Sequence, residues 1–204
     1  MPAFTTLVQS LGIAYASGIS PYATVALLGI ASRMGWIGPL PGALQAVTSV
    51  WIIALAGALA VVEFMATLIP GVASAWETVH SAIRPPAAAF LAVLTAWHGE
   101  PALIIAAGLL GGSLGLATHA TKAGLRYAID TSPEPVTNGV ANIAELGVVA
   151  SLSYAIWHHP YTALAVALAL LVLLMLLVRA IWRTLRRALG TVLRGRRAGE
   201  ATGG

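Results

Sequence analysis

Cysteine is absent from this sequence of 204 residues, and charge is scarce, because only 9% of the residues are Asp, Glu, Lys or Arg. Without cysteine the chain can form neither a disulfide framework nor a cysteine-based metal site. Of the 18 charged residues (11 basic and 7 acidic), eight follow Val178 and the other ten are scattered over the long preceding stretch. A soluble domain of this composition would have too little polar surface to cover itself. The sequence therefore predicts an integral membrane protein.

Apolar residues make up 58% of the chain, and the mean hydropathy is +0.86. Residues 161–178 (YTALAVALALLVLLMLLV) contain no charge and no helix breaker. At ~1.5 Å per residue, such a segment is about long enough for a helix to cross a hydrocarbon core. Residues 1–32 contain no Lys or Arg, so we expect no signal peptide, whose first region needs them.

The fold class expected from this pattern is an all-α membrane protein with about six transmembrane helices. The predicted spans are residues 5–32, 47–69, 86–98, 102–127, 139–157 and 160–182. The third of these is too short to span a membrane unless its helix begins earlier, near Ala73, and bends at Pro85-Pro86.

A cut near Gly99 divides the spans into two halves, 1–99 and 100–187, followed by a basic tail, 188–204, that we expect to be disordered. Each half places an interrupted first helix, rich in small residues, before a second helix with one buried acid. Three spans per half invert the second half relative to the first. The sequence is therefore compatible with two inverted three-helix repeats, as in many secondary transporters.

The distribution of basic residues predicts the orientation, because cytoplasmic loops are enriched in Lys and Arg. With six spans and a cytoplasmic C-terminus, ten basic residues lie on the cytoplasmic side and Arg33 alone lies on the other. An even number of spans also places the N-terminus in the cytoplasm. We therefore predict a multi-pass protein with both termini cytoplasmic.

Three strings of the sequence carry a family resemblance. They are ASGISPYATVALLGIASRMG (16–35), VEFMATLIPGVASAWETVHSAIRPP (62–86) and ATHATKAGLRYAIDTSPEPVTN (117–138). Together they resemble the domain-of-unknown-function 4126 family of small bacterial membrane proteins. The resemblance implies a shared fold and a bacterial inner-membrane location, but no established activity. Members of that family often carry acids around the IPGV string, where this chain has Thr67 and Ala73, so we expect no role for charge at those two points.

The string Ser17-Gly18-Ile19-Ser20-Pro21-Tyr22 interrupts the first apolar stretch. Pro21 removes a helix hydrogen bond and Gly18 relaxes the backbone, so the helix should break or kink there. Ser20 as N-cap and Pro21 at the first helical position favour a new helix start, whose free N–H groups would point at a substrate near mid-membrane. The alternative is a proline kink satisfied by neighbouring helices. The pathway candidates from this string are Ser17, Gly18, Ser20, Pro21 and Tyr22.

Glu63 and Glu145 are single acids inside otherwise apolar segments, and they are equivalent in the two predicted halves. A carboxylate at that depth costs several kcal/mol unless it is protonated, paired or hydrated, so both are candidates for a proton or cation site. The alternative is a structural pair with Lys122, Arg126 or the Tyr22 hydroxyl.

Glu77, His80 and Arg84 recur at i, i+3 and i+7, on one face of a helix that starts after Pro70-Gly71. We expect an amphipathic interfacial helix leading into the third span, with this polar face turned to water or to a vestibule, or ion-paired. Glu77-x-x-His80 is half of a carboxylate di-metal motif, but the chain has no second half, so we predict no metal and no cofactor.

His119, Lys122 and Arg126 form one stripe of the fourth span and should face the bundle interior or an aqueous cavity, since lipid would not tolerate them. The segment after them is extended by its prolines, so it could fold back and pair Glu134 with Arg126. The alternative is snorkelling of Lys122 and Arg126 to the cytoplasmic interface. Asn138 follows this segment and joins Glu134 as a secondary candidate.

Two further features concern the membrane surface. His158-His159 stands before Pro160, where adjacent histidines are more often interfacial than metal ligands. The tail contains seven arginines between 179 and 197 with apolar residues between them, which indicates a basic amphipathic helix on anionic lipid headgroups. Nucleic acid is not expected as a partner, because the arginines follow a membrane span directly.

These observations favour a small transporter or channel for a small solute or ion, with its polar pathway between the two halves. This hypothesis predicts that Tyr22, Glu63, His119, Lys122, Arg126 and Glu145 converge within one cavity. The rival is a non-transporting scaffold or accessory subunit in which the same charges form closed pairs. An enzyme is not expected, since no HExxH, GxSxG or paired-aspartate motif is present. A homo-oligomer is compatible with either reading.

Overall fold

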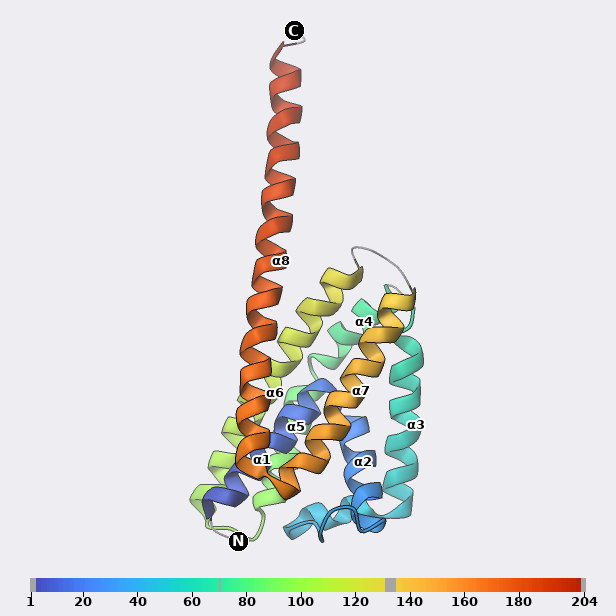
Figure 1. The fold of residues 1–204 in the computed structure, drawn as a ribbon, viewed down its shortest axis with the longest axis vertical. Helices are drawn as coiled ribbons and strands as arrows, with labels where there is room; N and C mark the ends of the chain where they lie inside the picture. The colour runs from blue at the N-terminus through green and yellow to red at the C-terminus, as the bar shows by residue number, and fades with distance from the viewer. Residues whose placement is uncertain (1–2, 70, 131–134, 203–204) are drawn as a thin grey trace.

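The structure, a computed structural model, describes residues 3–69, 71–130 and 135–202, and in these residues every regular element is a helix. The helices are α1 (Ala3–Ile19), α2 (Pro21–Arg33), the 3-10 helix η1 (Gly42–Thr48), α3 (Val50–Ala66), α4 (Val72–His80), α5 (Arg84–Ala96), α6 (Pro101–Asp130), α7 (Pro135–His158) and α8 (Pro160–Thr202). Figure 1 shows them as a bundle from which α8 extends beyond the other helices. The prediction of an all-α fold is confirmed.

Three to five of these helical segments are long and apolar enough to cross a membrane. Three single helices meet this criterion, over Pro101–Ile129, Val136–His158 and Pro160–Thr184. Two more segments meet it only as bent pairs, η1 with α3 at 73° and α4 with α5 at 49°. The chain is therefore a helical protein of membrane type, and the predicted six spans are not confirmed.

The predicted first span, 5–32, is a pair of helices that enters the bundle and returns. The Phe4 ring stacks on Tyr161 with centroids 5.8 Å apart, and His158 Nε2 donates to the Trp36 carbonyl at 3.1 Å. The start of α1 and the residues after α2 therefore lie at the same end of the bundle, beside the α7–α8 turn (Figure 1). Figure 1 also shows the N-terminus at this end and the C-terminus beyond the opposite one.

The break between α1 and α2 follows from Ser20 and Pro21, as predicted. Ser20 has extended backbone angles (φ −152°, ψ 106°), and its Oγ accepts the Ala23 N–H at 3.2 Å. Pro21 takes the first position of α2, where its missing N–H costs no helix hydrogen bond. The tip of the α1–α2 pair is thus fixed by an N-cap inside the bundle.

The predicted bend of the third span is also present. Its helix begins at Val72, near the predicted Ala73, and the bend separates α4 from α5 at residues 81–83. Pro85 directly follows the first residue of α5, Arg84, where a proline starts a helix but cannot continue one from before. The bend places Arg84 at an internal helix start.

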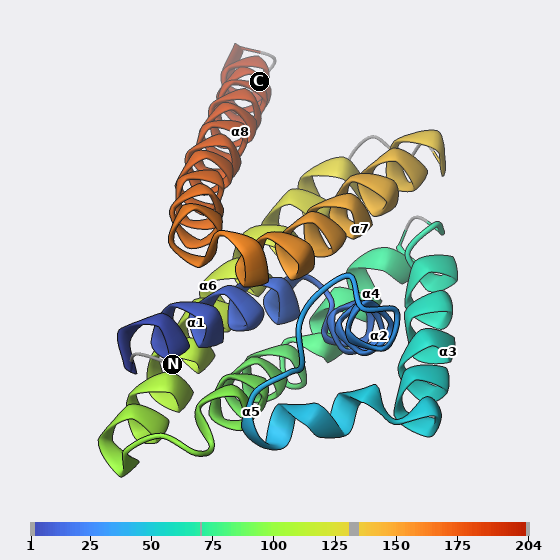
Figure 2. The same ribbon diagram turned by 60° about the horizontal axis from the view of Figure 1, so that its bottom comes forward.

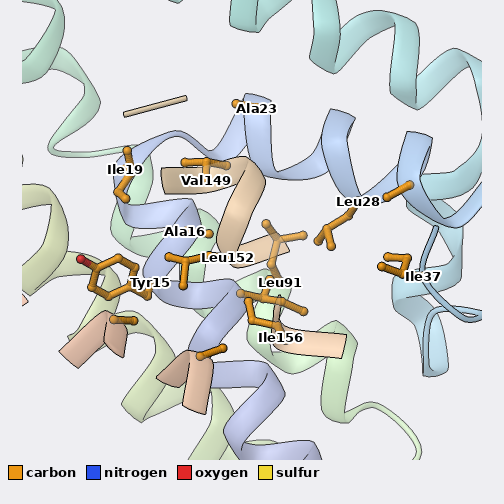
Figure 3. Close-up of a cluster of buried hydrophobic side chains, with 14 of the residues drawn as sticks. Tyr15, Ala16, Ile19, Ala23, Leu28, Ile37, Leu91, Val149, Leu152 and Ile156 are labelled. Carbon is orange, nitrogen blue, oxygen red and sulfur yellow. The ribbon is translucent and has the colours of Figure 1, made fainter. Parts of the chain in front are cut away.

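The apolar core joins α1, α2, α5, α7 and α8. Figure 3 shows Tyr15 and Leu28 from the first two helices together with Leu91, Val149 and Ile156, and all five are buried. On another side of α1, small residues bring α1, α5 and α6 together. A Cβ added to Gly18 would stand 2.6 Å from the Gly115 carbonyl oxygen, so α1 and α6 are in backbone contact. This tight packing fixes the tip of α1 against α6.

The structure also bears on the predicted repeat and on the tail that follows it. The inverted repeat is not confirmed: α6 runs unbroken from Pro101 to Asp130, whereas its supposed counterpart is divided at Ser20. The tail, which we expected to be disordered, continues α8 as far as Thr202. Figure 2 shows α8 leaving the bundle rather than turning across its end.

Candidate functional site

Six charged side chains from five different helices meet inside the bundle, and we call them the central cluster. They are Glu63 of α3, Glu77 of α4, Arg84 of α5, Lys122 and Arg126 of α6, and Glu145 of α7. Five are buried, and Glu145 is partly exposed with 24% of its side-chain surface accessible. Charges this far from water persist only when they are paired.

Arg84 holds the two carboxylates of the first half together. It is fully buried, and its guanidinium donates to Glu63 Oε1 through Nη2 and to Glu77 Oε2 through Nη1. A second bond from Nη2 to Glu77 Oε1 measures 3.2 Å. This forked arrangement uses the planar geometry that distinguishes arginine from lysine.

Lys122 occupies the middle of the cluster. Its ammonium donates to the Ile19 carbonyl at 2.8 Å, and it lies 3.0 Å from Glu145 Oε2 and 3.3 Å from Glu77 Oε1. Glu63 Oε1 is slightly farther away, at 3.7 Å. One ammonium is therefore surrounded by oxygens from four separate helices.

Arg126 links the cluster to two asparagines of α7. Its Nε donates to Glu145 Oε1 at 3.1 Å, and its Nη2 lies 3.0 Å from the same oxygen. Nη2 also donates to the Asn142 side-chain oxygen, and Nη1 donates to Asn138 Oδ1 at 3.5 Å. Asn142 in turn donates to the Phe64 carbonyl at 3.0 Å, which connects α7 to α3.

The tip between α1 and α2 presents each helix end to a charge of the opposite sign. Ser20 Oγ, at the positive N-terminal end of α2, donates to Glu63 Oε2. The Ile19 carbonyl, at the negative C-terminal end of α1, receives the Lys122 ammonium. Because a continuous helix would satisfy that carbonyl internally, the break at Ser20 is what makes it available.

Two histidines border the cluster, and the hydrogen bonds of His119 assign that ring as neutral. His119 Nδ1 lies 3.0 Å from Arg84 Nη1, which can only donate, so the ring proton sits on Nε2 and is donated to Ser81 Oγ at 2.8 Å. His80 Nδ1 donates to the Trp76 carbonyl at 2.8 Å, and its Nε2 lies 3.3 Å from the Tyr22 hydroxyl. Within the central cluster itself, three acids balance three bases.

A cavity of about 180 Å³ reaches the cluster from one side of α7. Its polar lining consists of Ser20, Glu63, Thr67, Lys122, Asn142 and Glu145, and apolar residues of α2, α3 and α7 complete the wall. Such a volume has room for several water molecules or one small solute.

The structure brings most of the predicted site residues into one network. Among the primary candidates, Ser20, Tyr22, Glu63, His119, Lys122, Arg126 and Glu145 all belong to it. Ser17 does not, because its hydroxyl bonds the Ile13 carbonyl of its own helix at 2.8 Å, and Gly18 serves only close packing. Of the six residues expected in one cavity, only Glu63, Lys122 and Glu145 line it.

The secondary candidates Glu77, His80, Arg84 and Asn138 also join the network. The polar face of α4 does not meet water: Glu77 is fully buried and His80 nearly so. The exposed face is the apolar one, with Val79 at 62% exposure. In a membrane-type bundle the apolar face turns outward and the polar face inward, so of the predicted alternatives for this face the structure shows the ion-paired one. Glu134 and its predicted pairing lie outside the described residues, and within them Arg126 pairs with Glu145.

Sequence reasoning missed Asn142, Thr67 and Ser81. Asn142 stands four residues after Asn138 and three before Glu145, so the three polar residues share one stripe of α7, which is a pattern visible in the sequence. Thr67 Oγ1 donates to the Asn142 side-chain oxygen at 3.0 Å. Because Thr67 carries no charge, we expected no charge-related role at this position. No sequence signal distinguished Ser81.

Among residues 3–69, 71–130 and 135–202, no three His, Asp or Glu side chains are grouped as metal ligands. His158, one of the paired histidines, stacks on Tyr154 with ring centroids 4.2 Å apart and bonds the Trp36 carbonyl. These contacts lie at the end of the bundle where the N-terminus lies.

Comparison with known proteins identifies the family of the chain. The sequence profile of a domain of unknown function (DUF4126) matches residues 7–180. The chain belongs to this family. No curated protein and no solved structure matches the chain. The DUF4126 match includes every helix that contributes to the central cluster, so the cluster lies wholly within the family domain.

Proposed function

We propose that this protein is a small-solute or ion transporter or channel of the bacterial inner membrane, with its polar pathway through the central cluster. The observation that carries the proposal is the cavity of about 180 Å³ that reaches Glu63, Lys122 and Glu145 inside the bundle. A dry structural pair would need no such access.

The position of the cluster supports this function. Glu63, Glu77 and Arg84 come from the first half of the chain, and Lys122, Arg126 and Glu145 come from the second. A polar pathway at the junction of two helix groups is the usual arrangement in transporters. The helix break at Ser20 adds two oriented helix ends to the same place.

The proposed orientation places the C-terminus in the cytoplasm, since cytoplasmic segments are rich in Lys and Arg and the tail contains seven arginines, whereas the end of α2 carries Arg33 alone. The α1–α2 pair returns to its starting end, so the chain then has five crossings. The N-terminus is therefore placed on the periplasmic side, which revises the expectation that both termini are cytoplasmic.

Flux measurements in proteoliposomes test the function. Purified protein is reconstituted and assayed for uptake of protons, potassium, methylammonium and small neutral solutes. We expect flux that falls at least tenfold in Glu63→Gln and Glu145→Gln. The matched control is Ser17→Ala, a buried substitution outside the cluster.

A scaffold or accessory subunit is the second candidate, and the complete pairing of the six charges favours it. This reading predicts no flux above that of protein-free liposomes for any of these solutes. It also predicts that Glu145 is protected from water. If no flux is measured and carbodiimide fails to modify Glu145 in the folded protein, the transport function is rejected in favour of the scaffold function.

A further inference from the structure

Lys122 differs from the two arginines of the cluster in that its removal leaves no carboxylate without a partner. Glu63 and Glu77 both retain Arg84, and Glu145 retains Arg126. Both guanidiniums are fixed by forked bonds, whereas the lysine is a point charge on a flexible stem of four carbons. Lys122 is therefore the cation of the cluster that can move at the lowest cost.

The surroundings of the Lys122 ammonium have the dimensions of a site for an ammonium group. Its four oxygen neighbours lie at 2.8, 3.0, 3.3 and 3.7 Å. Divalent metals require oxygens at about 2.0–2.6 Å, so this shell is too wide for them. The nearest neighbour is a backbone carbonyl that the helix break at Ser20 has released, and it can only accept a hydrogen bond.

Lys122 also stands between two cavities. One is the cavity of about 180 Å³ already described, and the other, of about 260 Å³, is lined by α1, α6, α7 and α8. Lys122 and Glu145 are the two residues common to both linings. The flexible lysine can therefore swing toward the second cavity while it remains beside Glu145.

We propose that the Lys122 side chain occupies the binding position for the ammonium group of a small primary amine, and that such a solute enters by displacing it. The proposal names the substrate class of the function proposed above and rests on that function for its role in flux. The binding itself does not require flux. In this arrangement Lys122 determines specificity. When the lysine moves away, its positive charge and its N–H donors leave the shell of oxygens, and the solute must supply both.

The absence of cysteine from the chain provides a direct test. In Lys122→Cys, the cluster lacks one positive charge and the shell is vacant. Methylammonium chloride should raise the Tm of this variant by about 4 °C at ten times its Kd, relative to equal tetramethylammonium chloride, which has the charge but no N–H donor. Alkylation of the cysteine with 2-bromoethylamine restores an ammonium at the same reach and should abolish the difference.

The double variant Lys122→Cys/Glu145→Gln is the matched control. It restores equal numbers of acids and bases and removes one oxygen charge, so its Tm should not distinguish the two salts. Equal Tm in both salts for folded Lys122→Cys would overturn the proposal. If the single variant folds only when purified with methylammonium, the proposal is supported. If it folds in neither salt while the double variant folds, a free amine does not replace the lysine and the proposal fails.

The two proposals can fail separately. A methylammonium-dependent Tm without flux in liposomes would retain the amine site and remove the transport function. Flux by the wild-type protein, with a Tm of Lys122→Cys that is the same in both salts, would retain transport and remove the amine site.

Discussion

The Lys122 ammonium donates a hydrogen bond of 2.8 Å to the carbonyl of Ile19, 103 residues earlier in the chain. This contact joins the last residue of α1 to the middle of α6. It requires both the helix break, which frees the carbonyl, and the lysine, whose side chain bridges the gap. The break and the charged cluster are therefore one structural unit.

Ser20 should matter more to this unit than Pro21. Ser20→Ala removes the cap on Ala23 and the hydroxyl bonded to Glu63, so we expect a loss of about 1–2 kcal/mol in the free energy of unfolding. Pro21→Ala retains the extended Ser20 and its cap, so its effect should stay below about 1 kcal/mol. Unfolding in mixed detergent measures both. A larger loss for Pro21→Ala would mean that proline rigidity, not the cap, maintains the break.

Gly18 tests the close contact of α1 with α6. A methyl group there would stand 2.6 Å from the Gly115 carbonyl oxygen, so Gly18→Ala should cost about 1–3 kcal/mol through overpacking. Gly38→Ala is the control, because a Cβ at Gly38 has nothing within 4 Å. Equal Tm values for the two variants would show that α1 and α6 are not in backbone contact.

The pair of Arg84 and Glu77 should be strongly coupled. Arg84→Met leaves two buried carboxylates without their shared guanidinium and should destabilise the protein by about 3–5 kcal/mol. Glu77→Gln removes one of those charges, so the double variant should be more stable than Arg84→Met alone. A double-mutant cycle measures this coupling. Additive losses would indicate that the two side chains do not share an ion pair.

Labelling of introduced cysteines should reveal five crossings. The native chain has no cysteine to interfere. We expect Ala3→Cys and Gly99→Cys to react with a membrane-impermeant maleimide added to spheroplasts, and Arg183→Cys to react only after lysis. Six crossings predict the opposite result for Ala3→Cys, which makes that position decisive.

Much of the fold could be predicted because helix signals are local. Ser20-Pro21 predicted a cap and a break, Pro85-Pro86 predicted a bend, and the uncharged run 161–178 predicted a span. The direction of the chain after a break could not be predicted. Whether α2 continues α1 or returns beside it depends on its packing against α3 and α7, which is a tertiary property.

Some residues of the candidate site could likewise be predicted from the sequence, and others could not. Glu63 and Glu145 could be identified because an acid in an apolar segment needs a partner. For Glu77 and Arg84 the sequence could not decide between a face turned to water and an ion-paired face, because amphipathicity alone does not say which face meets lipid. In a soluble protein or at a membrane surface the polar face turns to water, whereas here it is buried against α6.

The equal number of acids and bases in the central cluster has an electrical consequence. A single elementary charge that crosses the membrane potential is worth about 2.3 kcal/mol per 100 mV, but a neutral group of charges experiences no net force in that field. The cluster can therefore shift with its helices without responding to voltage. Any voltage dependence of flux through this protein would then report the charges that move separately from the cluster, which are the solute and a displaced Lys122 ammonium, and the neutralisation of one acid or base would convert the cluster itself into a voltage-sensitive element.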